Sequence, residues 1–266
     1  MGEDITHLPT VKTMSCTLPQ SPIPFCILYV YLCSACRPKP GGLNCFFMKR
    51  LTETVENYLK AIFRFSRTEQ SVSTNVIAQH LGTSAASVTD MLKKLCDEKL
   101  VEYTPYKGAT LTPEGQQVAL QIIRKHRLWE VFLVEKLQFS WDNVHDVAEQ
   151  LEHIDSPELI RRLDEFLGYP KFDPHGDPIP DEDGAIEFRN TLLLTELLPG
   201  ARGVLVRVRR SDADFLQYLD RLGLPLGAHI ALVERLPYDD SLVLEVGTRQ
   251  VVLGGSIAEN LFLLPE

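Results

Sequence analysis

The spacing of apolar residues changes near residue 170, and this change constrains the fold more than any other feature. Before it, apolar side chains recur three and four positions apart, as at Val55, Leu59, Ile62 and Phe63, which is the spacing of an amphipathic helix. After it, short apolar runs alternate with turn residues, which is typical of strands. We therefore expect a mainly helical N-terminal part followed by a small β-rich part.

The first helical segments have the order of a winged helix-turn-helix. Thr52 is a plausible N-cap, because a short hydroxyl side chain accepts a hydrogen bond from the first free amides of a helix. The spacing predicts helices over 52–65, 73–81 and 84–98, then strands over 100–104 and 109–111 around a turn. Helices followed by a two-stranded hairpin in this order indicate a DNA-binding head.

Three further helices are expected next. Thr112 and Pro113 open a long one to about Leu137, a second is predicted over Trp141–Ile154, and a third ends near Leu167. The second has an apolar stripe that we expect to be buried: Val144, Val147, Ala148, Leu151 and Ile154. Four prolines and five acids over 170–184 predict a loop and linker. Strands over 203–209, 229–236, 242–246 and 250–253, with a helix over 215–223, predict a small β-barrel.

These elements divide the chain into five segments: an extension over 1–47, a winged helix-turn-helix over 48–112, a helical metal-binding and dimerisation domain over 113–169, a Pro-rich linker over 170–186 and an SH3-like domain over 187–266. We expect the extension to be disordered, with Met48 as the physiological start, because its prolines prevent regular structure. Its apolar run over 25–33 is too short to span a bilayer. Cys96 is the single cysteine after residue 47, which fits a reducing cytoplasm.

Histidine and glutamate cluster in the acidic middle of the chain, where residues 111–185 carry 7 basic and 16 acidic side chains. His145, Glu149, Glu152 and His153 would share one face of a helix, and the pair His126 and Glu130 lies four residues apart on another. Imidazole and carboxylate without thiolate favour Mn²⁺ or Fe²⁺. Because the chain has no His-Glu-x-x-His sequence, we expect a metal sensor and not a metallohydrolase.

The predicted recognition helix begins with short hydroxyl side chains and carries two lysines. We expect contacts with DNA phosphates from Ser84, Ser87, Thr89 and Lys94, contacts with base edges from Ala86 and Asp90, and a backbone or minor-groove contact from Tyr106 and Lys107 in the wing. The small positive charge of residues 48–110, nine basic against seven acidic side chains, predicts binding that depends on dimer geometry and metal more than on charge.

Several ordered sequence features resemble the diphtheria-toxin-repressor family of metal-dependent regulators, including its manganese-transport branch. These are Glu56-Asn57-Tyr58-Leu59-Lys60, the segment Ser84–Leu100, Arg124-Lys125-His126-Arg127-Leu128, Val144-His145-Asp146, Leu151-Glu152-His153 and the loop from Asp173 to Pro180. The C-terminal part resembles the SH3-like module of this family and of ferrous-iron transport accessory proteins. The resemblance covers the chain from about Met48 to its end.

The resemblance implies two metal sites per subunit. The regulatory site would use Asn57, Glu149, Glu152 and His153, with Glu56 or a water as a substitute for the first of these. The ancillary site would use His126, Glu130 and His145, completed by the C-terminal module near Ser211 and Asp214, with Asp212 close by. Glu149 stands where thiol-using relatives have cysteine, which favours Mn²⁺.

The resemblance also implies a cytoplasmic homodimer that represses metal-uptake genes from a palindromic double-stranded operator, with no membrane partner. An alternative is a metal-independent winged-helix regulator that responds to a small molecule. The two hypotheses differ in one observable: only the metal sensor should purify with stoichiometric metal.

Overall fold

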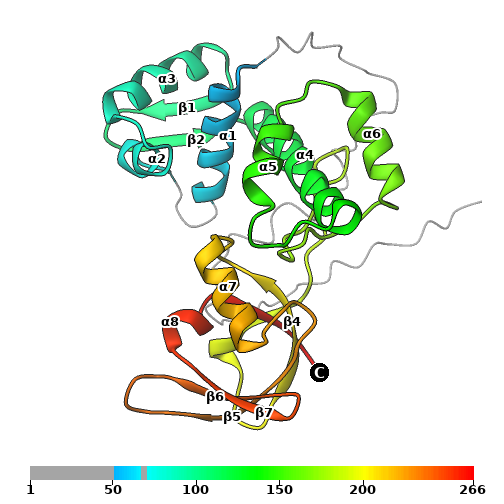
Figure 1. The fold of residues 1–266 in the computed structure, drawn as a ribbon. Coiled ribbons are helices and arrows are strands. Elements are labelled where there is room, and N and C mark those ends of the chain that lie inside the picture. Colours follow the sequence, from blue (N-terminus) through cyan, green and yellow to red (C-terminus); the bar gives the residue numbers. More distant parts are fainter. Residues whose placement is uncertain (1–50, 67–70) are drawn as a thin grey trace, which may run out of the picture. The chain divides into compact units, whose positions relative to one another are not determined.

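The computed structural model describes residues 51–66 and 71–266 (Figure 1). The predicted extension over 1–47 lies outside these residues. Within them, helices occupy the first part and a β-sheet the second, which confirms the expected fold class. No helix in the described ranges is both long and apolar enough to cross a bilayer.

The winged helix-turn-helix consists of α1 (Glu53–Ser66), α2 (Thr74–His80), α3 (Ala85–Asp97) and the antiparallel hairpin β1 (Val101–Thr104) and β2 (Gly108–Leu111). The Thr52 side chain accepts from the amide of Val55, as predicted, and Ser73 and Ser84 cap α2 and α3 by accepting from the amides of Val76 and Ser87. The two helices and the hairpin share one apolar core with α1, and the fully buried side chains in it include Leu59, Ile62, Ile77, Val88, Leu92 and Leu95.

The middle of the chain forms α4 (Pro113–Leu137), α5 (His145–Leu151) and α6 (Pro157–Phe166), and both shorter helices pack on α4 (Figure 1). Thr112 caps α4, as predicted, and its side chain accepts from the amide of Gly115. The helix α1 also packs on α4. This contact connects the DNA-binding head to the helices that carry the His/Glu cluster.

The prediction of one helix over Trp141–Ile154 was wrong in its extent. A turn in which the amide of Asn143 donates to the carbonyl of Ser140 precedes α5, and the amide of Ile154 closes a tight turn on Leu151 after it. Glu152 and His153 therefore lie just beyond the helix. The extended backbone of Ser156, which caps α6, prevents continuation of α5 into that helix. Ile154 was expected to be buried but is 38% exposed.

The proline-rich segment over 170–184 has no regular helix or long strand, as expected, yet it packs closely against the helices. Asp173, His175 and Ile179 are buried, and a bridge pairs Phe172 with Pro178. Gly176 has φ +84°, and a Cβ at this position would lie 2.0 Å from the carbonyl oxygen of Val206. The loop therefore needs glycine here. Its buried residues make it an ordered part of the fold, whereas we predicted a linker.

The C-terminal part is a six-stranded antiparallel sheet in the order β3-β8-β4-β5-β6-β7. Its elements are β3 (Leu192–Leu193), the 3₁₀ helix η1 (Leu194–Glu196), β4 (Arg202–Val208), α7 (Ala213–Leu222), β5 (His229–Arg235), β6 (Leu242–Val246), β7 (Arg249–Leu253), α8 (Gly255–Ala258) and β8 (Leu261–Pro265). The sequence predicted β4 to β7 and α7 but missed β3 and η1. No pairing between β3 and β7 is found in the described chain, so its strands form a sheet whose hydrogen bonding is open where a barrel was expected.

Candidate metal centre

Three predicted donors meet where α4 faces the start of α5. His126 and Glu130 lie one turn apart on α4, and the distance from His126 Nε2 to Glu130 Oε1 is 3.0 Å. His145, the first residue of α5, places Nδ1 3.1 Å from His126 Nε2 and 3.3 Å from Glu130 Oε1. His126 and Glu130 are buried, whereas the His145 side chain is 43% exposed. The three atoms form a nearly equilateral triangle.

The size and composition of this triangle fit a divalent metal. Two imidazoles and one carboxylate on one face are a known Fe²⁺ ligand set. Donors at right angles with bonds of about 2.1 Å would lie roughly 3 Å apart, close to the three observed separations. His126, Glu130 and His145 could therefore bind one face of an octahedral ion without a backbone rearrangement, and they leave the other positions to further ligands or water.

Both nitrogens of His126 face carboxylates. Nε2 faces Glu130, and Nδ1 lies 2.6 Å from Glu152 Oε2. Burial disfavours the charged imidazole, but the charge and hydrogen bond of Glu130 and the hydrogen bond of Glu152 outweigh it and raise the pKa of His126 to about 9. Burial likewise opposes ionisation of Glu130, and the charge of His126 holds the pKa of that carboxyl well below its usual range. A protonated His126 therefore supplies the positive charge between Glu130 and Glu152 when no metal is bound.

The predicted regulatory donors do not surround a common point. Glu152 is fully buried, and both of its oxygens contact Lys60 Nζ, at 2.6 and 2.8 Å. Glu149 is half-exposed and lies 3.8 Å from the same ammonium and 3.7 Å from His145 Nε2. Among the described residues, the two groups of His, Cys, Asp and Glu side chains that converge closely enough to hold an ion contain neither Glu149 nor Glu152.

Helix α1 supplies the remaining contacts of this region. Glu56 accepts a short hydrogen bond from His153 Nδ1 and lies 3.5 Å from Lys125 Nζ. Asn57 is one turn before Lys60, and its Oδ1 atom is buried without a hydrogen-bond donor in the described part of the chain. A buried acceptor without a partner is costly. The Asn57 oxygen is therefore available to a cation, which supports the predicted contact from α1.

His175 lies in the loop over 170–184 and was not among the predicted metal donors. Its Nε2 atom hydrogen-bonds to the carbonyl oxygen of Trp141 at 2.7 Å. Its Nδ1 atom also lies 3.7 Å from Glu130 Oε2, and Glu130, Asp173 and His175 form a second convergent donor group. Burial and the charge of Glu130 raise the pKa of Asp173 to about 7. The spacing of apolar residues in the sequence cannot show that an irregular loop lies beside α4, so this proximity was not predicted.

The predicted ligand from the C-terminal part does not join the convergent donors of the described residues. Asp214 is exposed in the first turn of α7 and belongs to neither convergent donor group of the described residues. Asp212 caps α7 through the amide of Phe215 and pairs with Arg210, and Ser211 is half-buried beside it. Whether this segment supplies a ligand stays a prediction.

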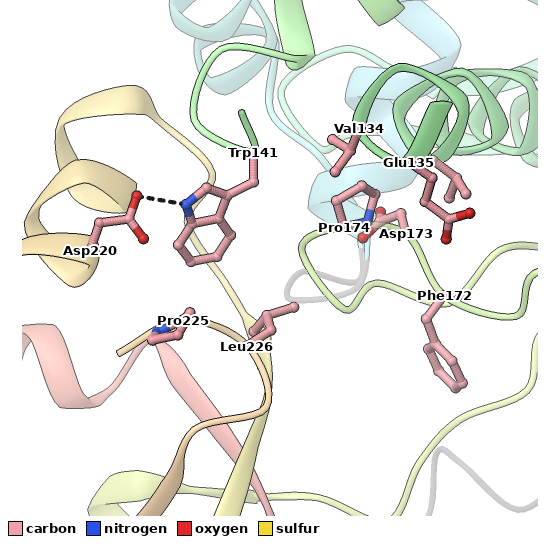
Figure 2. Close-up of a pocket in the computed structure, with 10 residues that line it drawn as sticks. Val134, Glu135, Trp141, Phe172, Asp173, Pro174, Asp220, Pro225 and Leu226 are labelled. Carbon is pink, nitrogen blue, oxygen red and sulfur yellow. Dashed lines mark hydrogen bonds between the residues drawn. The ribbon is translucent and has the colours of Figure 1, made fainter. Parts of the chain in front are cut away.

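A pocket of about 390 Å³ lies next to the loop but does not contain the convergent histidines (Figure 2). Its walls are largely apolar, with Val134, Phe172, Pro174 and Leu226 among the lining residues. Trp141 Nε1 donates to Asp220 Oδ2 across it at 3.0 Å. Asp173 of the second donor group lines this pocket, whereas His126, Glu130 and His145 converge outside it, at the contact of α4 with α5.

The predicted DNA-contacting side chains lie together on the exposed side of α3. Ser84, Ala86, Ser87, Asp90 and Lys94 are exposed, and Thr89 is half-buried. Two of the hydroxyls also serve the helix itself: Ser84 is the cap, and Thr89 donates to the carbonyl oxygen of Ala85. Asp90 pairs with Lys93 at 3.3 Å on this surface. The side chains in the first turn of α3 are thus largely exposed in the described part of the chain, and this turn can approach a groove.

The wing ends in the turn between β1 and β2. Tyr106 and Lys107 are exposed at its tip, where Tyr106 has φ +66° and the Lys107 amide donates to the carbonyl of Thr104. Gly108 follows, and a Cβ there would lie 2.6 Å from the carbonyl oxygen of Val72. This close contact fixes the wing against the segment that precedes α2.

Three family models match the chain in order. They describe the N-terminal DNA binding domain of iron dependent repressors (residues 50–109), their metal binding and dimerisation domain (residues 112–181) and the FeoA domain (residues 192–265). Together with the fold and the donor cluster, these matches define the class of the protein: a metal-dependent, DNA-binding transcriptional repressor.

Individual relatives agree with this class. Iron-dependent repressor IdeR of Mycobacterium tuberculosis is 30% identical over 225 residues, which are 79% of this chain and 96% of the relative. Diphtheria toxin repressor of Corynebacterium glutamicum is 30% identical over 196 residues, 70% of this chain and 86% of the relative. A manganese-dependent transcriptional repressor in complex with manganese superposes with a TM-score of 0.74 at 33% identity, covering 80% of this chain and all of the other. The chain belongs to the iron-dependent repressor family, and the resemblance inferred from its sequence is confirmed.

Proposed function

We propose that the protein is a Mn²⁺- or Fe²⁺-dependent repressor of metal-uptake genes with two metal sites per subunit. The ancillary site would use His126, Glu130 and His145, and the triangle of their donor atoms is the observation that carries the proposal. The regulatory site would use Asn57, Glu149, Glu152 and His153. Asp214 stays a candidate for a further ligand.

The contacts of Glu152 suggest how the two sites influence each other. Its carboxylate lies 2.6 Å from His126 Nδ1, so it can orient the ring whose Nε2 belongs to the ancillary site. A bound dication supplies positive charge that draws carboxylates together. Residues of α1 and of the α5 region contact each other already through Lys60 and Glu56. Donors from both segments would therefore fix the DNA-binding head against α4 when the regulatory site is filled.

A homodimer follows from the use of two reading heads on a palindromic operator. Large apolar side chains that are exposed on the helices support a subunit interface there, because burial in an interface would remove them from water. They include Leu137 on α4 and Leu159 and Phe166 on α6, and the exposed Tyr169 lies just after α6. We place the protein in the cytoplasm, where it can reach both DNA and the metal pool.

The decisive test measures DNA affinity with and without metal. Fluorescence anisotropy with a metal-uptake promoter duplex should show at least tenfold tighter binding in Mn²⁺ than in chelator. The variant Glu152→Ala/His153→Ala should lose this response. Asp146→Ala is the matched control, because this exposed carboxylate on α5 lies outside the donor groups. Equal affinity in both conditions would favour the alternative of a metal-independent regulator and overturn the proposal.

A further inference from the structure

Lys60 has an unusual position among the regulatory donors. Its ammonium group contacts both oxygens of Glu152, at 2.6 and 2.8 Å, and lies 3.8 Å from Glu149 Oε1. The Lys60 side chain is only 19% exposed and that of Glu152 is fully buried. Water therefore screens this ion pair weakly, and the pair is stronger than one on the surface.

The ammonium group of Lys60 is positively charged, as the regulatory ion would be. It lies between two carboxylates that the proposed function assigns to the regulatory ion. Asn57, three residues earlier on α1, shares the face of Lys60, and its buried Oδ1 atom has no donor among the described residues. An ion in this region would gain the Asn57 oxygen, which no hydrogen-bond donor of the described chain satisfies.

We propose that Lys60 is an affinity-determining residue for the regulatory site. In the metal-free protein its ammonium group takes the place of the divalent ion between Glu149 and Glu152, and the ion must displace it to bind. This inference rests on the proposed function. Lys60 thereby sets the metal concentration at which the site fills, because each ion gains its carboxylate ligands only by breaking the Lys60 contacts.

A second lysine provides a matched comparison. Lys125 lies 3.5 Å from Glu56 and its side chain is 18% exposed, nearly the same as that of Lys60. Its ion pair is with Glu56, and no contact of Lys125 with Glu149 or Glu152 is found in the described chain. Removing either lysine deletes one positive charge from the same acidic region. Only the removal of Lys60 frees the Glu152 carboxylate. A comparison of the two variants therefore distinguishes competition between Lys60 and the ion from the general effect of a lost positive charge.

The first measurement is the affinity for Mn²⁺ by calorimetry, in a His145→Gln background that weakens the ancillary site. Lys60→Gln keeps a neutral donor toward Glu152 and should bind Mn²⁺ at least tenfold more tightly, about 1.4 kcal/mol. Lys125→Gln should stay within about threefold of the background. A Lys60→Gln protein that binds no more tightly than Lys125→Gln overturns the inference.

The second measurement uses the unmodified chain and does not depend on a variant that folds. Reductive methylation followed by peptide mass spectrometry reports how freely each lysine reacts. Lys60 should react several-fold faster when Mn²⁺ is bound, because its ammonium group has left Glu152, whereas the rate at Lys125 should stay unchanged. Equal protection of Lys60 with and without Mn²⁺ overturns the inference.

The two proposals fail in different ways. A natural chain that binds neither Mn²⁺ nor Fe²⁺ overturns the proposed function. A natural chain that binds Mn²⁺ while Lys60 keeps its protection leaves the metal-dependent repressor intact and removes only the role of Lys60.

Discussion

Metal binding by the His126 cluster should release a proton, because the same nitrogen cannot hold both. Burial is the largest single effect on the pKa of His126 and lowers it. The charge of Glu130 and the hydrogen bonds of Glu130 and Glu152 together outweigh burial and raise this pKa to about 9. At pH 7 this is two units above the solution pH, so deprotonation costs about 3 kcal/mol and weakens metal affinity roughly a hundredfold. Affinity should therefore rise about tenfold per pH unit up to about pH 9.

The assay is Mn²⁺ titration by calorimetry between pH 6 and pH 8 in buffers with different ionisation enthalpies. The buffer dependence counts released protons, and we expect about one per ion from His126. The His126→Asn variant is the control, since it keeps an amide for hydrogen bonding but has no proton to release. An affinity independent of pH over this range, or equal proton release from the variant, would refute the reasoning.

The metal-free protein should show the opposite dependence on pH. The folded-state pKa of His126 lies above its unfolded value of about 6.5, so the folded state binds the proton more tightly. This contribution to the free energy of unfolding is fully present below about pH 6.5 and is lost as the pH rises through about 9. Thermal unfolding in chelator should show it, and addition of Mn²⁺ should restore stability most strongly at the alkaline end.

Three further predictions concern the scaffold and the DNA-binding surface. Arg124→Met should lower the free energy of unfolding by about 3–5 kcal/mol, because it leaves the buried carboxylate of Asp164 without its partner at 2.6 Å; urea unfolding measures this. Gly115→Ala should destabilise by roughly 1–3 kcal/mol or more in the same assay, since its Cβ would lie 1.9 Å from the carbonyl oxygen of Leu100. Lys107→Gln should weaken binding to every duplex alike and reduce the salt dependence by about one ion, and a changed sequence preference would contradict a phosphate contact.

Local sequence signals were sufficient for the winged helix-turn-helix. Thr52 and Thr112 were predicted to open their helices from a hydroxyl side chain before an apolar stripe, and each accepts from the amide three residues later. The end of α5 was not predictable in this way. Its apolar residues continue past Leu151, but the chain must turn so that Ser156 can cap α6, and the apolar pattern does not show this turn.

The donor set shows the same division. His126 and Glu130 could be paired from their spacing alone, because one helical turn brings them together. The approach of His145 required the packing of α5 on α4, and the proximity of His175 to Glu130 required the path of an irregular loop. Lys60 and Glu152 are 92 positions apart in the chain, so no local pattern could predict their contact.

The sequence by itself determined the helical order, the caps, the exposed face of the recognition helix and the types of donor available, because these depend on neighbours within a few residues. Only the tertiary structure decided which donors converge and which are held by other partners. Electrostatic and coordination contacts act over a few ångströms in space, and residues as distant in the chain as Lys60 and Glu152 reach that range only after α1, α4 and α5 have packed.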